Sequence, residues 1–257
     1  MKKKKRAIII ISIVAAAAIA AGGILLLVHR NNTKTAQNVT GGDGMEQTTQ
    51  YVSTGESKGK IKVACIGDSI TYGFGLSHPE KQAYPAQLQE MLGDEYEVVN
   101  FGLSGRTVSL QADMPYALED YYEQSQSFTP DIVLFMLGTN DTKPSNWDKE
   151  HFVSDFRFLV GSYVTLPGSP RVYVITPTPL FDMPAQADAP NEKTLKTQAV
   201  PLLKKEAAAM QLPVIDLYTA FAGKSDLFYD GCHPNEVGSK AIAQAIYQTI
   251  VKGKENG

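Results

Sequence analysis

The chain has 257 residues, of which 43% are hydrophobic, which is enough for one sizeable core and one domain with appendages. Its first 30 residues hold six Lys or Arg and no acid, so residues 31–257 carry 18 basic and 27 acidic side chains, a formal charge of −9. Binding to nucleic acid or to anionic lipid requires a basic face. The acidic body therefore excludes both as its main partner.

An apolar run from Ala7 to Val28 follows five basic residues at the start of the chain. At ~1.5 Å per residue the run would span about 33 Å, which matches the roughly 30 Å core of a bilayer. The asymmetric charge predicts that residues 1–30 are a membrane anchor and that the body lies outside the cytoplasm. The alternative is a cleaved signal peptide, because Ala18-Ile19-Ala20 resembles a cleavage site. In that case the body would be secreted.

Residues 31–59 are rich in Thr, Gln, Asn, Gly and Ser, and this composition predicts a flexible polar linker. From residue 60 to 252, short β-type runs alternate with longer helical patterns, and residues 253–257 form a tail. This alternation predicts one α/β domain with a parallel sheet covered by helices on both faces. The predicted strands are 61–66, 96–99, 131–137, 171–175 and 213–215, and the predicted helices are 83–92, 110–127, 149–164, 192–210 and 235–251.

The first predicted strand ends in Gly67-Asp68-Ser69, a tight turn that places one hydroxyl at the carboxyl edge of the sheet. Open α/β sheets bind their ligands at this edge. A nucleophilic Ser69 would need a base, a carboxylate that orients the base, and donors for an oxyanion. His233 lies three residues after Asp230, just before a helix start at Pro234. The turn can fold Asp230 onto the imidazole, whose other nitrogen can then accept the proton of Ser69.

Two further strand-end segments, 100–105 and 138–141, offer donors for the oxyanion. Gly105 can bring its backbone N–H close to a carbonyl because it has no side chain. Asn140 can add a side-chain N–H, and the backbone N–H of Ser69 would be the third donor. Taken alone, Gly105 and Asn140 are also explained by turn chemistry, and Asp230 and His233 by turn and capping roles. Together, the four segments predict a Ser-His-Asp triad with an oxyanion hole.

These segments resemble the four signature blocks of the SGNH (GDSL-type) esterase/lipase family: Gly-Asp-Ser at 67–69, Ser-Gly at 104–105, Gly-x-Asn-Asp at 138–141 and Asp-x-x-His at 230–233. The resemblance covers residues 60–252, with the blocks in the family's order. It implies a three-layer αβα flavodoxin-like fold with a five-stranded parallel sheet. The implied roles are nucleophile for Ser69, base for His233, orienting carboxylate for Asp230, and oxyanion hole for Ser69, Gly105 and Asn140; Gly102 is the alternative glycine.

The resemblance also implies a carboxylic ester hydrolase that needs no cofactor. Residues 61–75 and 230–235 are most similar to bacterial exported acetylesterases that act on carbohydrates. The expected partner is a small-molecule or polysaccharide ester, with no nucleic acid and with membrane contact through the N-terminal helix only. Two alternatives use the same triad: a lysophospholipase or thioesterase, and an acyltransferase to a sugar hydroxyl. A catalytically silent carbohydrate-binding module is disfavoured because the set of reactive residues is intact.

Other sequence features support no second site. Cys65 lies in the first strand and Cys232 precedes His233; two buried thiols are the preferred interpretation, and a disulfide between them is the alternative. The sequence shows neither a His/Cys cluster with metal-ligand spacing nor a Gly-rich phosphate loop, so we expect no metal and no nucleotide. The loop at 177–191, with four prolines, could be a lid, a wall of the substrate site or a plain connection.

Overall fold

A computed structural model of the protein describes residues 59–182 and 188–255. The predicted membrane segment at 1–30 and the predicted linker, apart from Gly59, lie outside the described residues, as does the end of the predicted tail. No helix within the described ranges combines the length and the apolar character that a membrane crossing requires. The structure therefore bears on the predicted domain at 60–252 and leaves the anchor and the linker as expectations.

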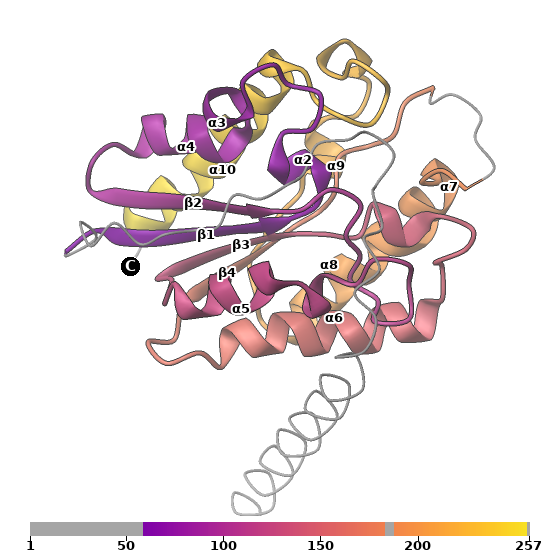
Figure 1. Cartoon of the computed structure of the whole chain (residues 1–257), viewed down its shortest axis with the longest axis horizontal. Helices are drawn as coiled ribbons and strands as arrows, with labels where there is room; N and C mark the ends of the chain where they lie inside the picture. Colours follow the sequence, from indigo (N-terminus) through magenta and orange to yellow (C-terminus); the bar gives the residue numbers. More distant parts are fainter. Residues whose placement is uncertain (1–58, 183–187, 256–257) are drawn as a thin grey trace, which may run out of the picture. The chain divides into compact units, whose positions relative to one another are not determined.

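The core of the domain is a sheet of five parallel strands in the order β2-β1-β3-β4-β5 (Figure 1). This order is that of flavodoxin-like folds, and it reverses between β1 and β3, where such sheets open a crevice for ligands. The five-stranded parallel sheet that the resemblance implied is therefore confirmed. The strands are β1 (Ile61–Gly67), β2 (Tyr96–Gly102), β3 (Ile132–Met136), β4 (Arg171–Ile175) and β5 (Val214–Ile215).

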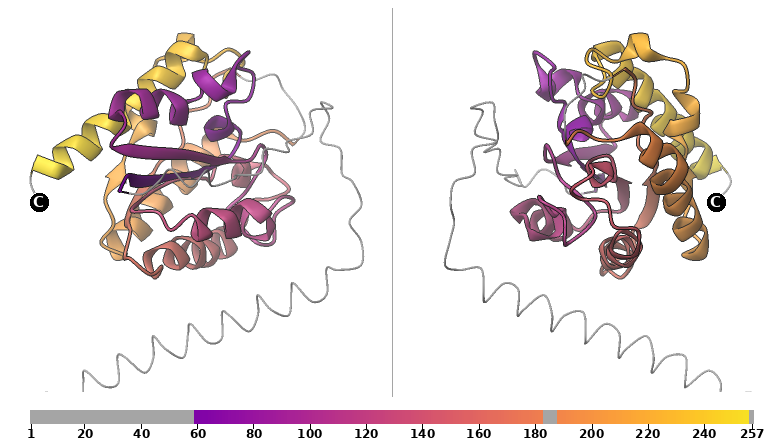
Figure 2. Two further views of the ribbon diagram at one scale, coloured as in Figure 1. Left: turned by 60° about the vertical axis from the view of Figure 1, so that its left-hand side comes forward. Right: turned by 90° about the vertical axis from the view of Figure 1, so that its right-hand side faces the viewer.

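Helices connect the strands and cover both faces of the sheet (Figures 1 and 2). The α-helices of the described ranges are α2 (Ser69–Tyr72), α3 (Pro79–Gln82), α4 (Tyr84–Leu92), α5 (Asp120–Ser127), α6 (Lys149–Val164), α7 (Glu192–Thr194), α8 (Val200–Ala209), α9 (Leu217–Ala220) and α10 (Glu236–Glu255). The other helical segments of the described ranges are three 3₁₀ turns, η1 (Tyr116–Leu118), η2 (Asn140–Thr142) and η4 (Ser225–Leu227), and one π-helix, η3 (Leu195–Ala199).

Alternate side chains of the central strands enter two separate cores, because successive residues of a strand point to opposite faces. Phe135 packs with α5, α6 and α8 on one face of the sheet. Leu134, its neighbour on β3, packs with α4 and with Ile242 and Ile246 of α10 on the other face. Burial on both faces explains why these strands are continuous apolar runs and do not alternate with polar residues.

The predicted helix at 110–127 is wrong over its first part, because helical structure begins only at Tyr116. The backbone N–H of Leu110 donates to Asp155 Oδ2 at 2.8 Å, and that of Asp113 donates to Asn146 Oδ1 at 3.1 Å. Side chains from distant parts of the chain thus fix the backbone of this segment. The segment forms an ordered loop at the carboxyl edge of the sheet instead.

The predicted helix at 192–210 is confirmed as one continuous helical run with a change of geometry inside it. The run passes from α7 through the π-helix η3 into α8. Pro201 lies at the start of α8, and its ring nitrogen has no hydrogen to donate to the preceding turn. A local widening of the helix just before a proline accommodates the missing donor.

Candidate active site

The first functional turn joins β1 to α2. Asp68 precedes the helix, and its carboxylate Oδ1 accepts the backbone N–H of Ile70 at 3.0 Å, which caps the helix. Ser69 is therefore the first residue of α2, and its side chain lies at the carboxyl edge of β1. A side chain at Gly67 would come within 1.9 Å of Thr71 Oγ1. Only glycine allows the strand to turn this tightly into the helix.

The three predicted triad residues form one chain of hydrogen bonds. Ser69 Oγ lies 2.9 Å from His233 Nε2, and His233 Nδ1 lies 2.7 Å from Asp230 Oδ2. The other carboxylate oxygen of Asp230 accepts the backbone N–H groups of Cys232, at 2.9 Å, and of His233, at 2.7 Å. The short Asp-x-x-His turn thus fixes the carboxylate from its own backbone.

The ionisation of Asp230 follows from these contacts. Burial acts to raise the pKa of this carboxyl, but the hydrogen bonds from the His233 ring and from the two backbone amides outweigh it and hold the pKa below its usual range. An ionised Asp230 keeps the hydrogen of the imidazole on Nδ1. Nε2 then faces Ser69 as an acceptor, the tautomer that a general base needs.

The predicted segment 100–105 begins within the end of β2, and its two glycines have different structural roles. A side chain at Gly102 would lie 2.3 Å from the backbone nitrogen of Tyr72, so this glycine lets α2 pack against β2. Gly105 has a φ of +82°, a left-handed conformation that favours glycine. Within the described part of the chain no acceptor takes the backbone N–H of Gly105. Gly105 therefore fits the predicted donor better than Gly102.

Asn140 begins η2 shortly after the end of β3, and its side chain lies between the turn at Ser69 and the loop that carries Gly105. Its side-chain nitrogen donates to the carbonyl oxygen of Arg106 at 3.1 Å and lies 3.5 Å from Asp68 Oδ2. The side chain of Asn146 donates to the carbonyl oxygen of Asn140 at 3.0 Å and so fixes its backbone. The structure therefore brings all five predicted site residues to one edge of the sheet.

Asp141 joins two of these loops, a role that the sequence did not reveal. Its two carboxylate oxygens accept the backbone N–H groups of Val108, at 2.9 Å, and Ser109, at 2.8 Å. The side chain is only 1% exposed, and burial raises its pKa to about 7. Asp141 thus fastens the loop that carries Gly105 to the loop that carries Asn140. The only sequence signal was an acid next to Asn140 at a strand end.

Asp68 makes stability depend on pH. Burial raises the pKa of its carboxyl to about 6 in the folded protein, from an ordinary value of 3.8. At a pH between these two pKa values, Asp68 binds more protons in the folded state than in the unfolded state. Its contribution to the free energy of unfolding is therefore present below pH 4 and is lost as the pH rises through 6. The shift of about two pKa units corresponds to about 3 kcal/mol.

We therefore expect Asp68→Asn to gain stability relative to the wild type as the pH rises from 4 to 7. Asparagine can still accept the N–H of Ile70 and cap α2, so the substitution keeps that contact while removing the titrating group. Urea unfolding of both proteins at several pH values measures the effect. A stability difference that does not change with pH would show that Asp68 is ionised throughout this range.

The surroundings of the site bear on the remaining expectations. Cys65 and Cys232 are free, buried thiols that belong to the cores on opposite faces of the sheet, which confirms the preferred interpretation. In the described ranges, no group of three or more His, Cys, Asp or Glu side chains could hold a metal ion.

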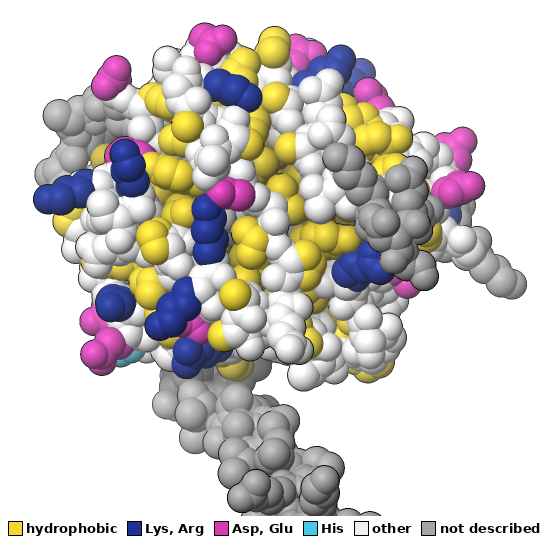
Figure 3. Space-filling model, turned by 180° about the vertical axis from the view of Figure 1, so that it is seen from behind, with side chains coloured by type: hydrophobic (Ala, Val, Ile, Leu, Met, Phe, Trp, Pro, Cys, Tyr) yellow, Lys and Arg dark blue, Asp and Glu magenta, His cyan; other side chains and the backbone are white. Residues whose placement is uncertain are grey.

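On the face of the molecule shown in Figure 3, the side chains of Lys and Arg are interspersed with those of Asp, Glu and apolar residues.

The sheet order and the Ser-His-Asp chain at its carboxyl edge are those of an SGNH-type hydrolase. The model of the GDSL-like lipase/acylhydrolase family matches residues 65–241, most of the described domain. The chain belongs to this family, and the family's description agrees with the expected class of carboxylic ester hydrolase. The expected family is therefore confirmed.

Individual relatives fit this assignment. An acetylxylan esterase from Xylanibacter ruminicola is 36% identical over 209 residues, which cover 74% of this chain and 43% of that protein. The chain thus spans less than half the length of this relative. A carbohydrate acetylesterase from Sinorhizobium meliloti superposes with a TM-score of 0.63 at 27% identity, covering 75% of this chain and 99% of the other. An aryl esterase from M. smegmatis has the same fold, with a TM-score of 0.62 at 23% identity. The match covers 75% of this chain and 99% of the other.

Proposed function

We propose that the protein is a serine esterase that removes acetyl groups from carbohydrate by means of Ser69, His233 and Asp230. The observation that carries this proposal is the chain of contacts of 2.9 Å and 2.7 Å from the serine hydroxyl through the imidazole to the carboxylate. Both lengths fall within the range of good hydrogen bonds. A serine between a base and an oxyanion site is the arrangement that acyl transfer through a covalent intermediate requires.

The reaction follows from this geometry in two halves. His233 Nε2 takes the proton of Ser69 as Oγ attacks the ester carbonyl, and the imidazolium then gives that proton to the leaving alcohol oxygen. An acetyl group remains on Ser69. In the second half His233 takes a proton from water, the hydroxide attacks the acetyl carbonyl, and Ser69 leaves with the proton that His233 returns. Asp230 stabilises the imidazolium in both halves.

The oxyanion of each tetrahedral intermediate would accept N–H groups from Ser69, Gly105 and Asn140. In the structure one N–H of Asn140 donates to Arg106, and its contact with Asp68 is longer than an ordinary hydrogen bond. The second N–H of this amide is thus weakly held and remains available to an oxyanion. The bond to Arg106 fixes the plane of the amide.

Asn140→Ala should lower kcat by about 10²–10³, which is the usual effect of removing one such donor. KM should change little, because the donor acts on charge that develops only in the transition state. Steady-state kinetics on p-nitrophenyl acetate measure both constants. Because Asn140 packs among buried side chains, a thermal unfolding curve of the variant is the control. An unchanged kcat in a folded variant would remove Asn140 from the proposed oxyanion hole.

Two relatives support acetylated carbohydrate as the substrate class, namely the acetylxylan esterase and the carbohydrate acetylesterase described above. We further propose that residues 1–30 anchor the protein in the cell membrane with the catalytic domain outside the cytoplasm. The basic start and the long apolar run support this placement. Polymeric carbohydrate esters of cell walls and of the environment would be accessible to an enzyme held there.

The chain-length preference of the full-length protein in detergent tests the substrate class. We expect the highest kcat/KM on p-nitrophenyl acetate, a lower value on the butyrate and the lowest on the octanoate, together with release of acetic acid from acetylated xylan. A maximum at octanoate would indicate a lipid acyl hydrolase instead. Acetyl transfer to added methyl xyloside in preference to water would indicate an acyltransferase.

A further inference from the structure

A tyrosine next to the triad is one of the few large apolar side chains that are exposed in the described domain. Tyr229 directly precedes Asp230, and 48% of its surface is accessible. Its backbone N–H donates to the carbonyl oxygen of His233 at 3.1 Å, and its hydroxyl donates to the carbonyl oxygen of Phe74 at 3.4 Å. The residue therefore bridges the loop that carries His233 and the loop that follows α2.

Gly75 makes this position of the ring possible. A side chain at Gly75 would lie 1.9 Å from the hydroxyl oxygen of Tyr229 and 2.1–2.4 Å from its ring carbons. The φ of Gly75 is +82°, which also favours glycine. The ring thus lies directly on the backbone of this loop. An aromatic side chain held in this way can bind a ligand without first losing conformational freedom.

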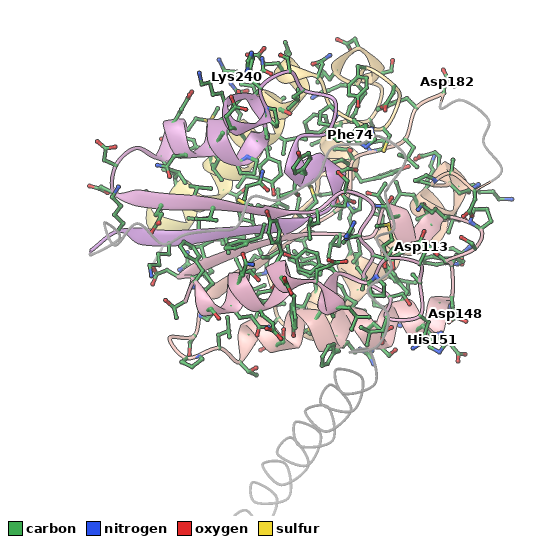
Figure 4. All side chains as sticks on the ribbon, in the orientation of Figure 1. Phe74, Asp113, Asp148, His151, Asp182 and Lys240 are labelled. Atoms are coloured by element: carbon green, nitrogen blue, oxygen red, sulfur yellow. The ribbon has the colours of Figure 1, made fainter. Side chains whose placement is uncertain are left out.

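The position of Tyr229 relative to His233 indicates which part of a substrate it would contact. The two rings are nearly parallel, at 21°, with their centroids 5.9 Å apart. Phe74, which is labelled in Figure 4, lies on the same loop as Gly75. Its ring centroid is 4.8 Å from that of His233. In the proposed mechanism His233 delivers a proton to the leaving alcohol oxygen. The alcohol part of the ester must therefore lie on the His233 side of Ser69, beside Tyr229.

We propose that the exposed ring of Tyr229 is a binding platform for the sugar ring of the leaving alcohol, and this rests on the proposed function above. A pyranose with equatorial substituents presents C–H groups on both faces of its ring. Stacking such a face on a tyrosine removes apolar surface from water on both partners, while the sugar hydroxyls stay at the rim. Burial of the hydroxyl and the nearby Asp230 carboxylate raise the pKa of Tyr229, so that the phenol stays neutral.

Two acetate esters separate the platform from the chemistry. Ethyl acetate and a mono-acetylated methyl xylopyranoside carry the same acyl group, but only the second has a sugar ring. Tyr229→Ala should lower kcat/KM for the xylopyranoside about tenfold, mainly by raising KM; tenfold corresponds to about 1.4 kcal/mol. The same substitution should change kcat/KM for ethyl acetate less than about twofold. Tyr229→Phe keeps the ring and should retain most of the activity on the xylopyranoside.

A matched control is Val164→Ala, because Val164 is also an exposed apolar residue but ends α6 at the opposite edge of the sheet. This substitution should leave kcat/KM for both esters unchanged. If Tyr229→Ala lost kcat/KM equally on both esters, Tyr229 would only position His233. If the variant kept the wild-type kcat/KM on both esters, Tyr229 would not contact the sugar. Either result would overturn the proposal of a sugar-binding platform. A wild-type protein that hydrolyses neither ester would instead overturn the proposed function.

Discussion

Ser69→Ala is expected to lower kcat on p-nitrophenyl acetate by about 10⁶, the loss that removal of a triad serine causes in a serine hydrolase. The substitution removes one oxygen atom, which is the atom 2.9 Å from His233 Nε2. Without it no acetyl-enzyme can form, and only attack by water assisted by the remaining groups is left. KM should stay near its wild-type value. Stopped assays at high enzyme concentration are needed to measure the residual rate.

Ser77→Ala is the matched control for this prediction, since Ser77 is an exposed serine in the loop after α2. Its hydroxyl donates to Gln82 Oε1 at 3.2 Å, away from the candidate site. This variant should keep the wild-type kcat. A Ser69→Ala protein that folds and hydrolyses the ester at the wild-type rate would contradict the assignment of the nucleophile.

Asp230→Asn is expected to lower kcat by about 10⁴ while the fold is retained. Two backbone N–H groups hold the Oδ1 position, so the oxygen of asparagine should remain there and its NH₂ should face His233 Nδ1. Nδ1 must then accept a hydrogen bond, which places the imidazole hydrogen on Nε2. Because that tautomer cannot take the proton of Ser69, kcat falls and KM is largely unaffected.

Asp226→Asn makes the same chemical change four residues earlier, at an exposed position in η4, and should leave kcat unaltered. The wild type and both variants should be compared in one pH series on p-nitrophenyl acetate. Wild-type activity of Asp230→Asn at every pH would show that the carboxylate does not control the tautomer of His233.

Local pattern was sufficient for most of the fold. The strand 171–175 and the helix 149–164 have the predicted bounds, because an apolar run and an amphipathic period each specify an element without help from distant residues. The sequence patterns did not predict α2, α3 and α9, which have only four residues each. Such short helices carry too few periodic positions to be recognised.

The errors lie where distant side chains determine the backbone. The loop at 110–115 resembles a helix in its sequence, but Asp155 and Asn146 bind its N–H groups from other elements. The role of Asp141 was hidden for the same reason, since its partners Val108 and Ser109 lie more than 30 residues away. Pairings of this kind depend on the completed sheet, and no local pattern reveals them.

The contacts within the candidate site could be expected from the sequence because the spacing of its residues is tied to chemistry. Asp230 and His233 lie in one short turn, so that their contact could be anticipated from the sequence. Tyr229 could not be distinguished from an ordinary surface aromatic, because its position depends on Gly75, more than 150 residues earlier. The exposed ring beside the triad became evident only when the two loops were brought together.

Covalent labelling of the nucleophile tests the central proposal most directly. The full-length protein would be treated with a fluorophosphonate, which loses fluoride as a serine oxygen bonds to phosphorus, and would then be digested and analysed by mass spectrometry. We predict one phosphonyl group, located on Ser69, with parallel loss of esterase activity and no label in Ser69→Ala. A label on another residue, or full activity after complete labelling of Ser69, would contradict the proposed mechanism.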